Sequence, residues 1–129
     1  MKELSKTQLV PLFKDNHDKA FVLVIGRESC PQCSAISSMI DGMNGNEKLA
    51  NVDVFHYTMT DEDFDNEDSE IHQIEKLGNF QIMSMPTVVY GTGVADKKDN
   101  VQKSGFVMAS TLEANITLLL ENRKTQLDE

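Results

Sequence analysis

The sequence contains no tryptophan, three prolines and only two cysteines among its 129 residues. A chain of this length can bury a full apolar core, so its fold does not need a framework of disulfides. No apolar run approaches the roughly 18 residues that a membrane-spanning helix requires. Basic residues are scarce as well, 12 against 21 acids, which gives a net charge of −9. This balance argues against nucleic acid and anionic membranes as partners, because both require clustered lysine and arginine.

The overall composition, 40% hydrophobic and 26% charged, is ordinary for a globular protein. We therefore expect residues 1–129 to form a single domain. Residues 1–18 mix polar and charged side chains and show no export signal, which predicts that the chain stays in the reducing cytoplasm. In that compartment, two closely spaced cysteines are more often catalytic or metal-binding than a structural cross-link.

The two cysteines, Cys30 and Cys33, lie between a predicted strand and a predicted helix. The continuous β-branched and aromatic run at residues 21–25 is typical of a central strand covered on both faces. Pro31 suits the first position of a helix, where its missing N–H costs nothing. Cys33 then falls on the apolar stripe of that helix, which continues through Ile36, Ile40 and Met43. Cys30 is therefore expected at the exposed tip of the helix.

This position favours redox chemistry at Cys30. Unpaired N–H groups and the positive end of the helix dipole favour a thiolate over a thiol. Because thiolates attack disulfides, Cys30 is predicted to be the nucleophile and Cys33 the resolving thiol. Two alternatives remain open, a pair of structural thiols or half of a zinc site. Only His17, His56 and His72 could complete a zinc site, and none stands in the close pairs that metal motifs prefer.

Capping residues predict where the first and last helices begin. Ser5 and Gln8 form a capping box for an N-terminal helix that begins or bends near Pro11. A second capping box, Ser110 and Glu113, precedes the clearest apolar stripe of the chain.

Periodicity predicts the elements between these helices. Residues 52–57 alternate as a strand, residues 71–77 follow a helical stripe that Gly78 ends, and residues 101–108 read as the returning strand of a hairpin. Gly105 in that strand predicts a bulge or a close approach of backbones. The order of elements predicts an α/β fold, with a central mixed sheet of about four strands and helices on both faces.

Residues 61–70 contain seven acids. The alternating aspartates suggest a calcium-binding loop, but Asn66 stands where such a loop needs glycine and His72 where it needs a bidentate glutamate. We therefore expect an acidic, solvated loop that leads into the next helix.

A second motif lies about fifty residues after the cysteines. The Ser-Met-Pro-Thr sequence at residues 84–87 places Pro86 directly before a strand-like run, which predicts the first residue of a strand or a tight turn with a cis bond. Together with the Cys-Pro-Gln-Cys motif and the order of elements, it resembles the thioredoxin superfamily. Gly105 is similar to the glycine that this family carries between its last strand and last helix. The resemblance covers residues 5–125.

The resemblance implies a thioredoxin-like fold and a thiol–disulfide oxidoreductase acting on protein substrates. The cysteine pair would be the only redox group, without cofactor or metal, and electrons would come from a reductase or from glutathione. Met85 and Pro86 would present a backbone edge to an extended substrate segment. Pro31 and Gln32 would tune the reactivity of the pair. Met83 would belong either to an apolar docking surface or to the core.

Several residues depart from thioredoxins proper. Ser29 stands where these carry tryptophan, and Val24 replaces a buried acid that assists proton transfer to the second thiol. Pro31 in place of glycine is more similar to glutaredoxins and oxidising periplasmic enzymes, and Glu28 is expected to point to solvent. The chain also loosely resembles accessory proteins of bacteriocin export in Gram-positive bacteria. An alternative function is therefore a binding or accessory protein with a thioredoxin fold and little redox activity.

Overall fold

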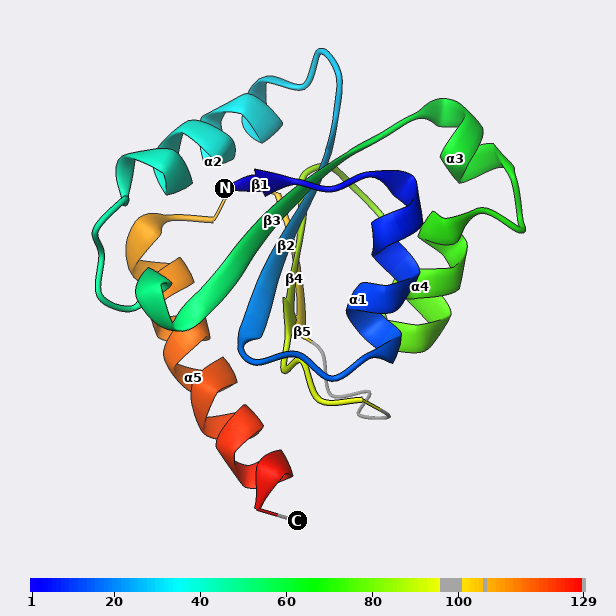
Figure 1. The fold of residues 1–129 in the computed structure, drawn as a ribbon. Coiled ribbons are helices and arrows are strands. Elements are labelled where there is room, and N and C mark those ends of the chain that lie inside the picture. Colours follow the sequence, from blue (N-terminus) through cyan, green and yellow to red (C-terminus); the bar gives the residue numbers. More distant parts are fainter. Residues whose placement is uncertain (96–100, 106, 129) are drawn as a thin grey trace.

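The computed structural model describes residues 1–95, 101–105 and 107–128. Within these residues a five-stranded mixed sheet has the order β1-β3-β2-β4-β5 (Figure 1). β3 is parallel to β1 and β2, whereas β4 is antiparallel to β2 and β5. The strands are β1 Lys2–Glu3, β2 Ala20–Arg27, β3 Val52–Met59, β4 Thr87–Gly91 and β5 Val101–Ser104. The predicted α/β fold with four main strands is confirmed, and the two-residue β1 is an addition that no pattern predicted.

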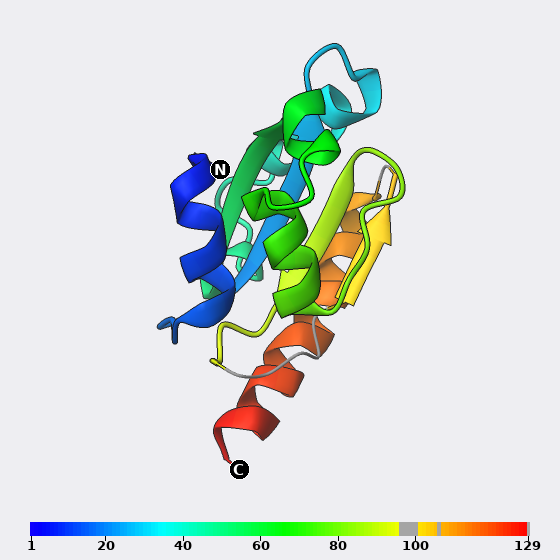
Figure 2. The ribbon, with the colours of Figure 1, turned by 90° about the vertical axis from the view of Figure 1, so that its right-hand side faces the viewer.

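Helices cover both faces of the sheet, as expected (Figures 1 and 2). α2 (Pro31–Gly42) and α5 (Ala109–Leu127) lie on one face, and α1 (Leu9–Lys14) and α4 (Glu70–Gly78) lie on the other. The short elements are η1 (Lys6–Gln8), η2 (Leu49–Asn51) and α3 (Asp61–Asp65). No helix in the described part of the chain combines the length and the apolar character needed to cross a membrane.

The sheet separates two apolar cores, and β2 contributes to both. Phe21, Leu23 and Ile25 pack with α1 and α4, while Val22 and Val24 pack with α2 and α5. This alternation follows from the geometry of a strand, whose successive side chains point to opposite faces. The continuous apolar run therefore forms a central strand, as predicted.

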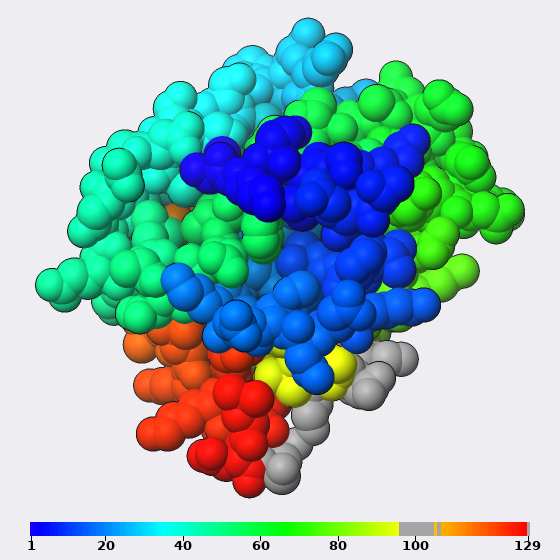
Figure 3. All heavy atoms as spheres, viewed as in Figure 1, coloured from blue at the N-terminus to red at the C-terminus, as the bar shows by residue number. Residues whose placement is uncertain are grey.

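The N-terminal helix begins where its capping box predicts. The Ser5 N–H donates to Gln8 Oε1 at 2.8 Å, and η1 continues directly into α1. Pro11 lies in the first turn of α1, where proline is tolerated. Figure 3 shows this N-terminal segment, in dark blue, on the surface between α2 and α3.

The last helix begins earlier than predicted. Its N-cap is Met108, with extended backbone angles (φ −70°, ψ 153°), and α5 starts at Ala109 without a side-chain cap. The predicted capping box of Ser110 and Glu113 is therefore wrong, because Ser110 is already inside the helix. The preceding Val107 is buried against the core, which fixes where the chain turns away from the sheet. The apolar stripe itself is confirmed, with buried Leu112, Ile116 and Leu119.

Most of the acidic segment is exposed, as we expected, but it is not a loop throughout. Its first part forms α3, where Thr60 Oγ1 accepts a hydrogen bond from the Asp63 N–H at 3.1 Å. Asp63 is only 2% exposed. Its oxygens accept hydrogen bonds from the Tyr57 hydroxyl at 2.7 Å and form an ion pair with the Lys6 ammonium at 3.0 Å. These partners offset the cost of burying a carboxylate.

The end of α4 also differs by one residue from the prediction. Gly78 is the last helical residue, but the left-handed residue that ends the helix is Asn79 (φ 56°). Asparagine tolerates this conformation better than most side chains. A Cβ atom on Gly78 would lie 2.7 Å from Phe80 Cδ1 and 2.9 Å from Phe13 Cε1. The glycine therefore allows close packing of two rings.

Candidate redox site

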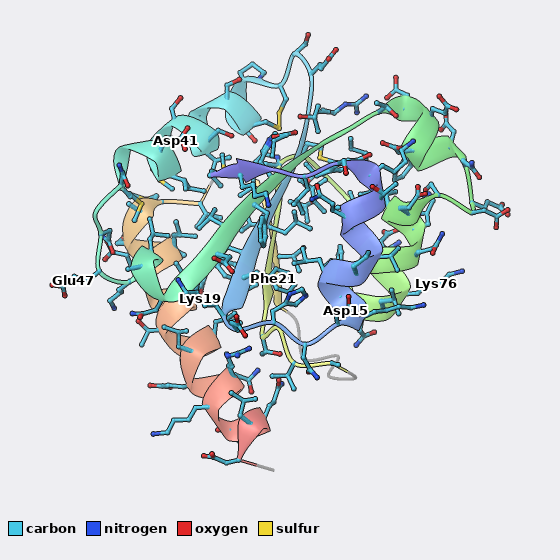
Figure 4. The ribbon with its side chains drawn as sticks, in the orientation of Figure 1. Asp15, Lys19, Phe21, Asp41, Glu47 and Lys76 are labelled. Carbon is cyan, nitrogen blue, oxygen red and sulfur yellow. A yellow bond between two sulfur atoms is a disulfide. The ribbon has the colours of Figure 1, made fainter. Side chains whose placement is uncertain are left out.

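Cys30 and Cys33 lie at the start of α2 and are joined by a disulfide, with their Cα atoms 5.2 Å apart. Figure 4 shows this bond in yellow, near the opposite end of α2 from the labelled Asp41. Cys30 is the N-cap of the helix, and its Sγ accepts a hydrogen bond from the Cys33 N–H at 3.2 Å. The predicted placement of Cys30 at the helix tip is confirmed.

The chain turns sharply between β2 and α2. β2 ends at Arg27, and Ser29 adopts a left-handed conformation (φ 59°), which is uncommon for serine. Pro31 is the first residue of α2, as predicted, and both Pro31 and Gln32 are exposed. This turn brings Cys30 to the surface of the molecule.

The two sulfur-bearing side chains have different environments. Cys33 is 4% exposed, on the face of α2 that packs against the sheet, whereas Cys30 is half-buried. An incoming sulfur can therefore reach Cys30 more easily than Cys33. The N–H group that contacts Cys30 Sγ and the start of the helix would both stabilise a thiolate there.

Pro86 lies at the same end of the sheet as the cysteines. Its peptide bond with Met85 is cis, and Pro86 precedes the first residue of β4, which fits the predicted tight turn and not the predicted first residue of a strand. β4 starts at Thr87, which pairs with Ile25 near the end of β2. The Pro86 turn and the loop that leads to Cys30 therefore lie at the same end of two neighbouring strands, β4 and β2.

Gly105 follows β5 and contacts the Pro86 turn. Its N–H donates to the Pro86 carbonyl oxygen at 2.7 Å, and its φ of 83° is left-handed. No heavy atom lies within 4 Å of the position that a Cβ would take, so the backbone conformation rather than space favours glycine here. β5 ends at Ser104, so the predicted strand at residues 101–108 is too long; Phe106 lies outside the described residues.

A groove of about 390 Å³ extends from the Met85 turn to α3. Arg27 and Asp61, which form an ion pair, contribute to its lining. Met83 is 78% exposed and Phe64 is 47% exposed, so Met83 belongs to a surface and not to the core. The apolar residues of this groove are Met59, Phe64, Ile82, Met83 and Met85. Nothing in the sequence pattern singled out Phe64, because α3 was not predicted.

Asp63 holds α3, and with it one wall of the groove. Burial alone would raise the pKa of Asp63, but hydrogen bonds from the Tyr57 hydroxyl, the Thr60 N–H and Lys6 lower it to about 2. Burial, and then the bond to Asp63, raises the pKa of Tyr57, and the same carboxylate raises the pKa of Lys6. An ionised Asp63 thus connects β3, η1 and α3 at neutral pH.

Each histidine has its own partners. His17 contacts main-chain carbonyls of α1. A main-chain carbonyl of α3 and the Glu75 carboxylate raise the pKa of His72. His56 Nδ1 lies 2.5 Å from Glu3 Oε2. Within residues 1–95, 101–105 and 107–128, no group of three or more histidine, cysteine, aspartate or glutamate side chains is arranged to hold a metal ion.

Val24 and Glu28 lie where the sequence suggests. Val24 is fully buried beneath the face of the sheet that α2 covers, so β2 supplies no carboxylate to Cys33. Glu28 is exposed and points away from the core, as expected.

The order of elements, the cysteine pair at the start of α2 and the cis-proline turn define a thioredoxin fold. Chloroplastic thioredoxin z is similar over 92% of this chain and 93% of its own, at 17% identity and a TM-score of 0.65. A thioredoxin of Malassezia sympodialis is similar over 92% of this chain and 89% of its own, at 19% identity and a TM-score of 0.60. Thioredoxin-2 of the malaria parasite is similar over 78% of this chain and 82% of its own chain, at 17% identity and a TM-score of 0.55.

No protein-family model matches the sequence, and no curated protein sequence matches it. At identities of 17% and 19%, the likeness to these thioredoxins establishes the fold. Fold alone does not determine activity, which depends on the residues at the site.

Proposed function

We propose that this protein is a thiol–disulfide oxidoreductase that reduces or exchanges disulfides in protein substrates. The observation that carries the proposal is the setting of Cys30, the half-buried N-cap of α2 whose sulfur accepts the Cys33 N–H at 3.2 Å. Once the disulfide is reduced, that N–H and the helix dipole stabilise a thiolate, which is the attacking species in disulfide exchange.

Reduction of a substrate disulfide takes two displacements. The Cys30 thiolate attacks one substrate sulfur, forms a mixed disulfide and expels the other substrate sulfur as a thiolate. Cys33 then loses its proton and attacks Cys30 Sγ, which forms the Cys30–Cys33 disulfide and expels the first substrate sulfur. Two electrons pass from the cysteine pair to the substrate, and an external thiol restores the dithiol. Pro31 and Gln32, exposed beside the pair, tune its reactivity.

The substrate binds along the Met85–Pro86 turn. Pro86 is buried and Met85 is half-buried, so an extended segment would pair with the backbone of Met85 as an added strand. The neighbouring groove would receive an apolar side chain of the substrate, since Met83 and Phe64 expose flexible and aromatic surface there.

The cysteine pair is the only redox group that this mechanism needs, so we propose no cofactor or metal. Electrons would come from a reductase or from glutathione. A reducing cytoplasm would keep the pair in the dithiol form that attacks substrates. The net charge of −9 favours neutral or basic protein partners over nucleic acid and anionic membranes.

Insulin reduction by dithiothreitol tests the proposal. We expect wild type to accelerate the appearance of turbidity and Cys30→Ser to abolish the acceleration. Reduced Cys33→Ser, incubated with insulin after dithiothreitol has been removed, should instead accumulate a mixed disulfide with the substrate, visible as an added mass that renewed dithiothreitol removes. Ser34→Ala, on the exposed face of the same helix, is the matched control and should keep the wild-type rate. A wild type no faster than Cys30→Ser would refute the enzymatic function.

A second candidate is a binding or accessory protein that keeps the fold for docking, for example in bacteriocin export. The exposed apolar side chains of Met83 and Phe64 favour it. The similar malaria-parasite thioredoxin-2 is described as a component of a protein secretion machinery. Under this hypothesis, wild type and Cys30→Ser would be equally inactive on insulin.

A further inference from the structure

Gly26 on β2 has no side chain, and both Cys33 Sγ and His56 Nε2 lie close to the position that a side chain would take. A Cβ atom built on Gly26 would lie 3.3 Å from Cys33 Sγ and 3.4 Å from His56 Nε2. His56 lies on β3 and pairs with Val24 of β2, on the face of the sheet that α2 covers. Because glycine has no side chain, no side chain at this position of β2 separates the imidazole from the buried Cys33 sulfur.

Glu3 orients this imidazole. The register of β1 and β3 places Glu3 directly opposite His56, and Glu3 Oε2 lies 2.5 Å from His56 Nδ1. Thr58 Oγ1 donates to the other carboxylate oxygen at 3.2 Å and holds the carboxylate in place. A carboxylate at Nδ1 requires a proton on that nitrogen, so the neutral ring presents Nε2 as an acceptor. Among the described residues, His56 Nε2 makes no hydrogen bond.

Cys33 needs such an acceptor. Its side chain is 4% exposed, and forming a thiolate in so apolar a place is unfavourable without a nearby group that takes the proton. Of the elements around His56, β1 brings Glu3, β2 brings only the uncharged Val24 and Gly26, and α2 brings Cys33 itself. Asp41, two turns further along α2, pairs with the Met1 ammonium at 3.5 Å.

We propose that His56, oriented by Glu3, is the proton acceptor for Cys33 in the resolving step. This inference rests on the proposed function. In the mixed disulfide, the Cys33 thiol gives its proton to His56 Nε2, directly or through one water molecule. The thiolate attacks Cys30 Sγ, the Cys30–Cys33 bond forms, and the substrate sulfur leaves with the bonding electron pair. His56 then releases the proton to solvent, and the same steps in reverse protonate Cys33 when the disulfide is reduced.

Stopped-flow reaction of the reduced protein with dithiobis(nitrobenzoate) separates the two displacements. Attack by Cys30 releases the first coloured thiolate at a rate that rises with reagent concentration. Attack by Cys33 releases the second coloured thiolate, and the rate of this phase becomes independent of reagent concentration. We expect His56→Asn to slow only the second phase at pH 7, by about tenfold or more, and Glu3→Gln to slow it less. The difference between the variants and wild type should narrow as the pH rises, because hydroxide then replaces His56 as the acceptor of the Cys33 proton.

The experiment distinguishes failure of the inference about His56 from failure of the proposed function. His72→Asn, which removes the ring of another histidine–glutamate pair, should leave both phases unchanged. A second phase that is unaffected in both Glu3→Gln and His56→Asn, or slowed equally at every pH, overturns the inference while leaving the proposed function intact. Glu3 is 58% exposed at its side chain, so Glu3→Gln should fold even if His56→Asn does not. A wild type that releases no coloured thiolate from Cys30 would instead remove the proposed function.

Discussion

Replacing Asp63 with asparagine tests how much the ionised carboxylate stabilises the protein at α3, which forms one wall of the groove. Asp63 is 2% exposed and accepts hydrogen bonds from the Tyr57 hydroxyl at 2.7 Å and the Thr60 N–H at 3.0 Å. Lys6 adds an ion pair at 3.0 Å. Asparagine has nearly the same shape but no charge, so the substitution removes the ionised carboxylate and leaves the packing in place.

The expected loss follows from the pKa of Asp63. Its ordinary value of 3.8 falls to about 2 in the folded protein, because the hydrogen bonds outweigh burial, which alone would raise it. One pKa unit corresponds to about 1.4 kcal/mol, so the ionised group contributes about 2 kcal/mol at neutral pH. The folded pKa is the lower one, so the unfolded chain binds more protons between these values. The contribution is therefore complete above about pH 5 and lost as the pH falls through about 2.

Urea unfolding at pH 7, 5 and 3 measures this effect. Asp63→Asn should lower the free energy of unfolding by about 2 kcal/mol at pH 7 and by less at pH 3. The control is Asp61→Asn, which removes an acid that is 81% exposed at its side chain and should cost less than about 1 kcal/mol. A difference between wild type and Asp63→Asn that is the same at pH 7 and pH 3 would refute the reasoning.

Two further substitutions test the fold by urea unfolding. Gly91→Ala would place a Cβ into the ring of Phe21, which is 2% exposed, and should cost about 1–3 kcal/mol; Gly42→Ala meets nothing within 4 Å and should cost nothing. Equal stabilities of these two variants would contradict the packing of Phe21 on β4. Asn79→Ala should cost about 1 kcal/mol, because alanine disfavours the left-handed conformation at the end of α4, whereas Asn79→Gly should be neutral or stabilising.

Local patterns predicted the elements around the site. The apolar run at residues 21–25 gives a strand that is buried on both faces, and the helical stripe places Cys33 inward and Cys30 at the tip. Both depend on side chains close together in the sequence, whose spacing alone decides which face they share. The motif at residues 84–87 predicted the turn for the same reason, since proline restricts its own neighbours.

Features that depend on distant contacts were not predictable in this way. β1 has two residues, and its register with β3, which joins Glu3 to His56, links positions 53 apart in the chain. Burial of Val107 moved the start of α5, although a better capping sequence followed. The Thr60–Asp63 capping box was visible in the sequence, but the surrounding acids suggested a solvated loop. Burial overrode the local capping signal at α5, whereas at α3 the local capping signal was followed.

The most direct test of the central claim is the rate of iodoacetamide alkylation of Cys30 against pH, in reduced Cys33→Ser. The Cys33 N–H points at Cys30 Sγ from 3.2 Å at the start of a helix, and the substitution keeps that backbone donor. We expect the alkylation midpoint to lie below about pH 7.5. A midpoint at or above about pH 8.5, the value of an ordinary thiol, would show that the helix start does not stabilise the thiolate and would contradict the account.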